Sequence, residues 1–230
     1  MNDTYMMRIG AAAGMVGAVI FAIANMLHAR SDDIEIYAEQ IKAVAESDVW
    51  LTGHLMLFVG GILIAIFLIA LHRTMMDGLA GALSRIGYFG TVASTGVLTV
   101  LVGVDGIASK AVHDAWAAAP DAEKAVALRV AEAMENIDVG IFSAWIILFF
   151  GMTFIVYGLA VAMSDNFPKW MGWVAAALGL VSLVVGFYQA YDGLSVVITT
   201  YAFSGTATLL TVWVLVMAIL MARKTMQAKG

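Results

Sequence analysis

The amino-acid sequence predicts an all-α, polytopic membrane bundle of six transmembrane helices. Hydrophobic residues fill 62% of the 230 positions and charged residues only 13%, whereas soluble chains carry about 25% charged residues. The mean hydropathy is +0.92. Charge-poor stretches of the length that crosses a hydrocarbon core, roughly 20 residues, recur six times. Their apolar runs are continuous instead of alternating every second residue, which favours helices over a membrane barrel.

The predicted spans follow one another closely along the chain. They cover about residues 9–28, 50–72, 83–108, 138–163, 169–191 and 197–222. The connections are too short to hold an appended soluble module, so residues 1–230 are expected to form a single transmembrane domain.

Two connections are expected to carry helices beyond the membrane. Between the first two spans, an apolar stripe that includes Ile34 and Ile41 predicts a short amphipathic helix at the outer interface. The Ala-rich segment 109–119 extends the third helix until Pro120 ends it, and a long helix then leads into the fourth span. Together these helices are predicted to form a small roof over the bundle.

The second and third spans resemble the fourth and fifth, which indicates a tandem repeat of helical hairpins. Residues 57–60 (Leu-Phe-Val-Gly) match residues 148–151 (Leu-Phe-Phe-Gly), and the second helix of each hairpin ends in Asp-Gly, at Asp105 and at Asp192. A repeat of this kind relates the two hairpins by rotation about the membrane normal. Convergent composition among apolar helices is the alternative explanation.

The distribution of charge predicts the orientation. Of the 12 Lys and Arg residues, seven fall on the side that holds both termini, and 14 of the 17 carboxylates fall on the opposite side. The positive-inside rule therefore predicts a multi-pass protein of the bacterial cytoplasmic (inner) membrane with both termini cytoplasmic. The acidic outer face argues against nucleic acid as a partner. The expected partners are the lipid bilayer and either other membrane subunits or further copies of the chain.

Three of the four histidines gather at the outer ends of the predicted helices. Imidazoles beside a carboxylate suit a transition metal such as Zn, Cu or Fe, and the sequence predicts His28, His54 and His113 as its ligands. One haem held by two of them is the alternative cofactor; ordinary interfacial histidines are the alternative to any site. Trp50 is expected to be an aromatic-belt anchor, and His72, on the cytoplasmic side, a snorkelling residue. Because the chain has no cysteine, thiolate ligands, Fe–S clusters and Cys nucleophiles are excluded.

Two carboxylates are the predicted catalytic residues. Asp105, Ser109 and His113 are spaced four apart, which puts them on one face of a continuous helix with Asp105 deepest in the membrane. A carboxylate at that depth is costly without a cation, water or a proton partner. Glu135, on the fourth helix, is the second candidate, as metal ligand or proton acceptor. Hydration of Asp105 and a solvated acidic face around Glu135 are the alternatives.

A polar stripe runs along the sixth span. It consists of Thr200, Ser204, Thr208 and Thr211. Hydroxyls in membrane helices mostly bond to their own backbone or to a neighbouring helix. The alternative is a hydrated pocket that opens outward and is closed on one side by Tyr188 and Asp192.

Two segments resemble those of a known group of proteins. The run from Trp116 to Pro120, followed by an Ala-rich helix and a long span, and the run Pro168-Lys-Trp-Met-Gly-Trp173 resemble uncharacterised bacterial six-helix integral membrane proteins, described only as domains of unknown function. The resemblance implies a six-helix fold and brings no activity with it.

The sequence supports three functional hypotheses. The preferred one is a metal- or haem-binding membrane enzyme or redox protein with its site at the outer boundary. A non-catalytic accessory subunit of a larger membrane complex is the second, because intramembrane charge is scarce. The third is a small transporter of ions or solutes that uses Asp105 and Asp192 for coupling.

Overall fold

A computed structural model describes residues 3–28, 31 and 33–227, and regular structure in these residues is entirely helical. Segments named η are π-helical, with the wide turns of i→i+5 hydrogen bonding. The elements are α1 (Asp3–Leu27), α2 (Tyr37–Ala45), α3 (Trp50–Arg73), α4 (Gly78–Leu101), η1 (Val102–Ser109), α5 (Lys110–Ala118), α6 (Asp121–Trp145), η2 (Ile146–Thr153), α7 (Phe154–Met163), α8 (Lys169–Asp192), η3 (Val196–Phe203) and α9 (Ser204–Gln227).

The predicted fold class is confirmed. Among the described residues, six helical rods are long and apolar enough to cross a membrane. They are Thr4–Leu27, Trp50–Arg73, Gly78–Ala118, Asp121–Met163, Lys169–Asp192 and Val196–Met226. The third and fourth rods are longer than the predicted spans because η1 continues into α5 and because α6 begins at Asp121, which are the two extensions that the sequence predicted. The chain is therefore a multi-pass membrane protein.

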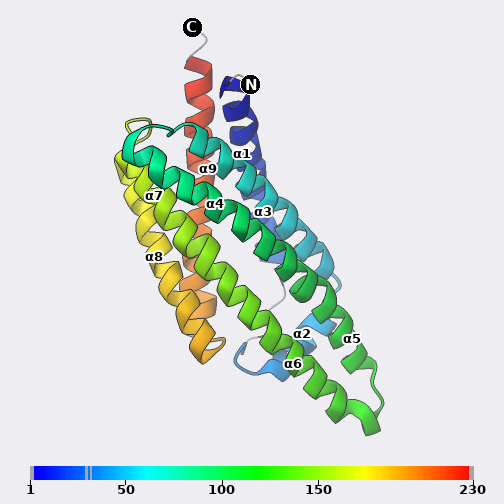
Figure 1. Cartoon of the computed structure of the whole chain (residues 1–230). Coiled ribbons are helices and arrows are strands. Elements are labelled where there is room, and N and C mark those ends of the chain that lie inside the picture. Colours follow the sequence, from blue (N-terminus) through cyan, green and yellow to red (C-terminus); the bar gives the residue numbers. More distant parts are fainter. Residues whose placement is uncertain (1–2, 29–30, 32, 228–230) are drawn as a thin grey trace.

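The two ends of the bundle differ. We call the end where α1 begins and α9 finishes the terminal end, and the opposite end, with α2, α5 and the start of α6, the distal end (Figure 1). The short amphipathic helix is α2, which packs on α5 and α6 with Ile41 and Val44 fully buried. The predicted roof is thus present at the distal end.

Small residues bring the helices close together in the half of the bundle near the terminal end. A Cβ atom on Gly14 of α1 would lie 2.9 Å from the Cβ of Ala218 on α9, and one on Gly158 of α7 would lie 2.5 Å from the backbone nitrogen of Ala176 on α8. Close backbone approach over small residues is how membrane helices associate. This half is therefore densely packed.

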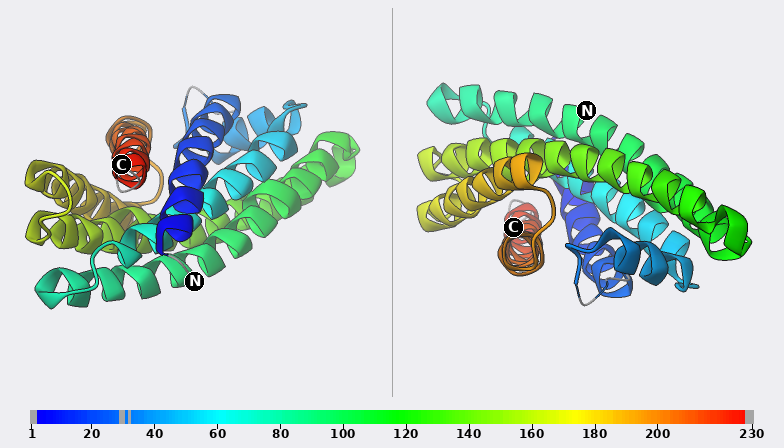
Figure 2. Two further views of the ribbon diagram at one scale, coloured as in Figure 1. Left: turned by 90° about the horizontal axis from the view of Figure 1, so that it is seen from above. Right: turned by 90° about the horizontal axis from the view of Figure 1, so that it is seen from below.

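The distal half contains a cavity of about 240 Å³. In the end views of Figure 2, α9 and the distal part of α1 lie on the side of the bundle opposite α4. The walls of the cavity come from parts of α1, α3, α4, α6 and α9 and from η1, η2 and η3, and Gln40 of α2 also lines it. Helices that touch near the terminal end thus enclose a hollow at the other end.

Candidate functional site

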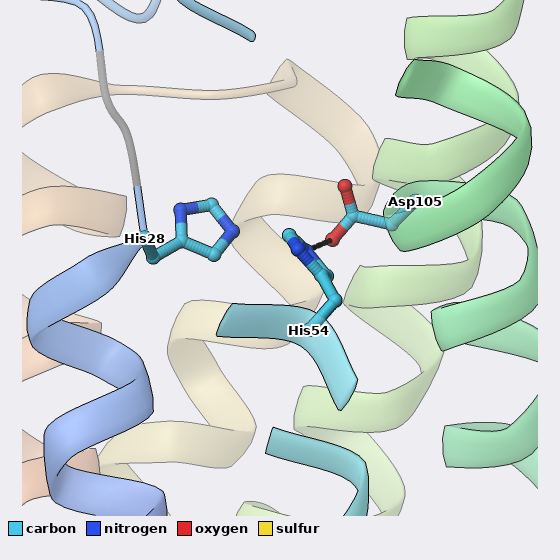
Figure 3. A group of neighbouring side chains, drawn as sticks. All are labelled: His28, His54 and Asp105. Carbon is cyan, nitrogen blue, oxygen red and sulfur yellow. Dashed lines mark hydrogen bonds and ion pairs between the residues drawn. The ribbon is translucent and has the colours of Figure 1, made fainter. Parts of the chain in front are cut away.

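Two histidines and an aspartate converge at the edge of this cavity (Figure 3). His28 directly follows α1, His54 lies in the second turn of α3, and Asp105 belongs to η1. One ligand atom from each of the three lies within 4.8 Å of the other two. The rings of His28 and His54 are 4.8 Å apart between centroids. Three helices far apart in the sequence therefore present three metal-ligating groups to one point.

The π-helical segment η1 gives Asp105 its position. A Cβ atom on Gly106 would lie 2.7 Å from the Cβ of His54, so only glycine at this position lets α3 approach η1 so closely. The indole Nε1 of Trp50 donates a hydrogen bond of 3.1 Å to the backbone carbonyl oxygen of Asp105. π-Helical turns are rare and concentrate at functional sites, and this one is tied to the helix that carries His54.

The hydrogen bonds of His54 determine which of its nitrogens faces the site. Nδ1 lies 2.8 Å from the backbone carbonyl oxygen of Trp50, which can only accept, so Nδ1 carries the proton. Nε2 faces Oδ2 of Asp105 at 2.9 Å. A neutral imidazole facing a carboxylate would oppose lone pairs on both atoms, so a proton or a metal ion must lie between them. Either His54 is an imidazolium paired with the Asp105 carboxylate, or a neutral Asp105 acid donates to Nε2, or a metal ion joins the two atoms.

The arrangement matches the requirements of a metal site in two respects. Metal-binding histidines almost always donate their second ring N–H to a carbonyl, carboxylate or water, as His54 does. Two ligand atoms that each lie about 2.1 Å from one ion are roughly 3 Å apart in octahedral and roughly 3.4 Å apart in tetrahedral coordination, and Nε2 of His54 lies 2.9 Å from Oδ2 of Asp105.

The cavity has a polar end and an apolar body. Its polar lining includes Asn25, His28, Gln40, His54, Asp105, Glu135, Asp138, Thr199, Thr200 and Ser204. The polar stripe predicted on the sixth span faces this cavity, since Thr200, Ser204, Thr208 and Thr211 all line it. Tyr188 and Asp192 do not: both are exposed, in the last two turns of α8. The stripe therefore borders a cavity, but Tyr188 and Asp192 do not close it.

His113 takes a different place from the other two predicted ligands. Its Nε2 lies 3.1 Å from Oε1 of Glu135, with both side chains almost fully buried, but neither ring nitrogen is aligned for a hydrogen bond. The prediction that Asp105 and His113 share one helix face assumed a continuous α-helix. In η1 each wide turn takes more residues, so Asp105 meets His54 while His113 meets Glu135.

Glu135 connects this second pair to the cavity. It lines the cavity together with Asp138, whose Oδ1 is buried and makes no hydrogen bond. The acidic face predicted around Glu135 is therefore not a solvated surface, because Glu135 is only 6% exposed. The predicted catalytic carboxylates, Asp105 and Glu135, thus both border the same hollow.

Two predictions for individual residues were wrong. Trp50 is no belt anchor: it is 2% exposed, and its ring packs against His28 and His54 at centroid distances of 4.7 and 4.3 Å. His72 does not snorkel: it is 8% exposed, and its Nδ1 lies 2.8 Å from Oγ of Ser84. Both residues belong to α3, which α1 covers on one side and α4 on another along much of its length.

A buried polar chain fixes the far wall of the cavity. The Thr199 hydroxyl of η3 donates to Oε1 of Gln189 on α8 at 3.0 Å, and Nε2 of Gln189 donates to Oγ of Ser143 on α6 at 3.1 Å. Ser143 in turn donates to the carbonyl oxygen of Val139 at 2.6 Å. These satisfied buried groups tie η3 to two neighbouring helices. No pattern in the sequence indicated this pairing of helices.

Comparison of the chain with protein-family models, with curated proteins and with solved structures finds no match. The resemblance to bacterial six-helix membrane proteins therefore stays a prediction.

Proposed function

We propose that this chain is a metal-dependent membrane enzyme that holds one transition-metal ion with His28, His54 and Asp105. The observation that carries the proposal is the orientation of His54, which donates from Nδ1 to a backbone carbonyl and directs Nε2 at a carboxylate oxygen 2.9 Å away. Two imidazoles and one carboxylate are the ligands of catalytic zinc sites and of non-haem iron sites. The carboxylate favours such an ion over a haem, whose axial ligands are usually His, Met, Cys or Tyr.

An open coordination sphere supports catalysis over a structural role. Structural zinc sites are closed by four protein ligands, whereas catalytic sites keep a position for water or substrate. Here three protein ligands border a cavity of about 240 Å³. Glu135 lines the same cavity and is the proposed proton acceptor for a group bound to the ion. The bound ion itself would supply Lewis acidity or redox chemistry.

The proposed setting is the bacterial inner membrane, with the distal end and its site facing outward. The excess of Lys and Arg on the side of the chain termini supports this orientation. An ion would then reach the site from the outer solution, where the acidic loops attract cations.

The test is metal analysis of the purified protein, with two histidines of α3 as a matched pair. After incubation with Zn²⁺, Fe²⁺ or Co²⁺ and removal of unbound ion, the wild type is expected to retain one ion per chain. His54→Ala is expected to lose it, with affinity at least 100-fold lower. His72→Ala removes an equally buried histidine from the other end of the same helix and is expected to keep the ion.

The absorption spectrum of the Co²⁺ form adds a second measurement. Its bands should change in Asp105→Asn and stay the same in His72→Ala. A folded wild type that retains no ion, or equal retention by wild type and His54→Ala, would contradict the proposal.

A further inference from the structure

The cavity opens sideways, toward the position of the lipid chains. On α1, Met26 lines the cavity and is 84% exposed; on α9, Val212 lines it and is 50% exposed. Thr208, one turn away from Val212, is exposed as well. These residues belong to rods long and apolar enough to span a membrane, so their exposed surface faces hydrocarbon. The gap between α1 and α9 lies on this exposed side of the two rods; we call it the lateral opening.

The divergence of α1 and α9 explains this opening. Nearer the terminal end the two helices touch, with Gly14 against Ala218 and Gly10 against Met221. Farther along, the cavity separates them, with Ala22 and Met26 on one wall and Thr208 and Val212 on the other. The two helices thus form a wedge, closed near the terminal end and open toward the distal end.

The interior of the cavity matches an amphipathic molecule. Away from the candidate ligands, its lining is apolar and largely aromatic, and includes Phe21, Leu57, Leu98, Phe142, Trp145 and Phe150. A volume of about 240 Å³ holds roughly ten heavy atoms, since a cavity of about 150 Å³ binds benzene. That is the size of a small headgroup with the first carbons of its chain, and the rest of a chain would extend through the lateral opening.

The polar end restricts the charge of the headgroup. It presents the carboxylates of Asp105, Glu135 and Asp138, and no Lys or Arg is among the cavity-lining residues that the structure describes. In the ion-free protein, the three carboxylates outnumber the two imidazoles of His28 and His54 at this end, so an anionic headgroup is unfavourable in a low-dielectric site. A headgroup that donates hydrogen bonds would find acceptors in the carboxylates and in the Thr199 and Thr200 hydroxyls.

We propose that the molecule bound here is a single-chain lipid whose headgroup donates hydrogen bonds and carries no negative charge, and that it enters between α1 and α9. The role of this lipid as a substrate rests on the metal-dependent function proposed above, whereas its binding to the cavity does not. The headgroup lies beside His28, His54 and Asp105, and the first carbons of the chain extend along the apolar lining toward Trp145.

Fluorescence quenching tests the proposal directly. The probe is a monoacylglycerol with a dibrominated chain, added to the detergent-solubilised full chain, because bromine quenches tryptophan only at short range. Trp145 lines the cavity and is 6% exposed. We expect a saturable quenching component that Trp145→Phe reduces, with Trp50 of the same cavity supplying the remainder, on top of unsaturable quenching of the exposed Trp170 and Trp173.

Two neighbouring residues of α9 provide the matched variants. Thr208→Phe fills the lateral opening and is expected to weaken saturable quenching at least tenfold. Leu209→Phe adds the same ring at an exposed position that does not line the cavity, and is expected to leave quenching unchanged. A dibrominated fatty acid of equal chain length, which is anionic, should bind to the ion-free protein at least tenfold more weakly than the monoacylglycerol.

The outcomes separate this proposal from the metal site. Absence of saturable quenching, or equal quenching in Thr208→Phe and Leu209→Phe, overturns the lateral entry of a lipid. Equal affinity for the fatty acid overturns the charge preference. Quenching that is lost only with Thr208→Phe, in a protein that retains no metal ion, supports the lipid cavity and contradicts the metal-dependent function alone.

Discussion

The two halves of this bundle share the same helices but differ in what fills the space between them. Toward the terminal end, α1 and α9 touch through Gly14 and Ala218, and α7 and α8 touch through Gly158 and Ala176. Toward the distal end, the side chains between α1 and α9 are replaced by a cavity of about 240 Å³. Small residues at one end of a helix pair thus determine where the two helices touch, and hence where they separate.

The polar groups follow the same division. In the terminal half, the buried Tyr157 donates its hydroxyl hydrogen to the carbonyl oxygen of Leu68 at 2.8 Å, a contact that only joins helices. In the distal half, Asp105, Glu135 and Asp138 all border the cavity. Buried carboxylates are costly and mark functional sites in membrane proteins. The densely packed terminal half therefore supplies the stability that the buried carboxylates of the distal half reduce.

The largest expected effect is a difference in stability between two variants that each introduce a leucine, one in the terminal half and one in the distal half. Gly158→Leu forces atoms into the backbone of α8, 2.5 Å away, and overpacking of this kind costs about 3 kcal/mol or more. Ala207→Leu adds similar volume to the cavity wall and should change stability by less than about 1 kcal/mol. Thermal unfolding in detergent measures both. Similar losses in the two variants would show that the distal half is not hollow.

A tenfold to 100-fold effect is expected where η1 meets α3. Gly106→Ala places a methyl group 2.7 Å from the Cβ of His54 and should displace the ring, which lowers metal affinity about 10- to 100-fold, as loss of an orienting contact usually does. Gly103→Ala adds the same methyl to the same segment where nothing lies within 4 Å and should leave affinity unchanged. Titration with Co²⁺ compares them, and equal affinities would remove the role assigned to η1.

The smallest effect should come from the roof over the cavity. The phenol of Tyr37 donates to Oδ1 of Asn136 at 3.3 Å, and burial together with the carboxylates of Glu135 and Asp138 raises its pKa. A raised phenol pKa means that the folded state holds the proton more tightly. Its contribution is therefore complete below about pH 10 and is lost as the pH rises further.

Tyr37→Phe should accordingly reduce the fall in melting temperature between pH 9 and pH 11. Tyr191→Phe, at a tyrosine that is 87% exposed, serves as the control and should follow the wild type. If all three proteins lose stability equally over this range, the Tyr37 phenol does not contribute to the roof.

The fold could be predicted because the membrane imposes one strong rule. Only helices satisfy the backbone of a long apolar segment, so continuous runs such as 50–72 translate directly into rods. The same rule could not reveal the π-helical turns, because the mean hydropathy of a segment does not depend on the register of its backbone hydrogen bonds. Residues 102–109 were accordingly predicted as part of an ordinary continuous helix, whereas the structure makes them π-helical.

The candidate site could be predicted only in part for the same reason. His28 and His54 were expected at the same end of the bundle, and the structure brings their ring centroids to 4.8 Å from each other. Asp105 was expected on the face of His113, and η1 turns it toward His54 instead. The burial of Trp50 depends on which helices surround α3, and that is a property of tertiary packing that no local pattern contains.

The position of His28 at the end of α1 links access to the site with the integrity of the site. One wall of the lateral opening, η3 and the start of α9, is anchored through Thr199 and Gln189. The other wall is α1, which ends next to His28. Any movement of α1 that widens the lateral opening also moves His28 away from the other two candidate ligands. An ion held by His28 would therefore keep the lateral opening narrow.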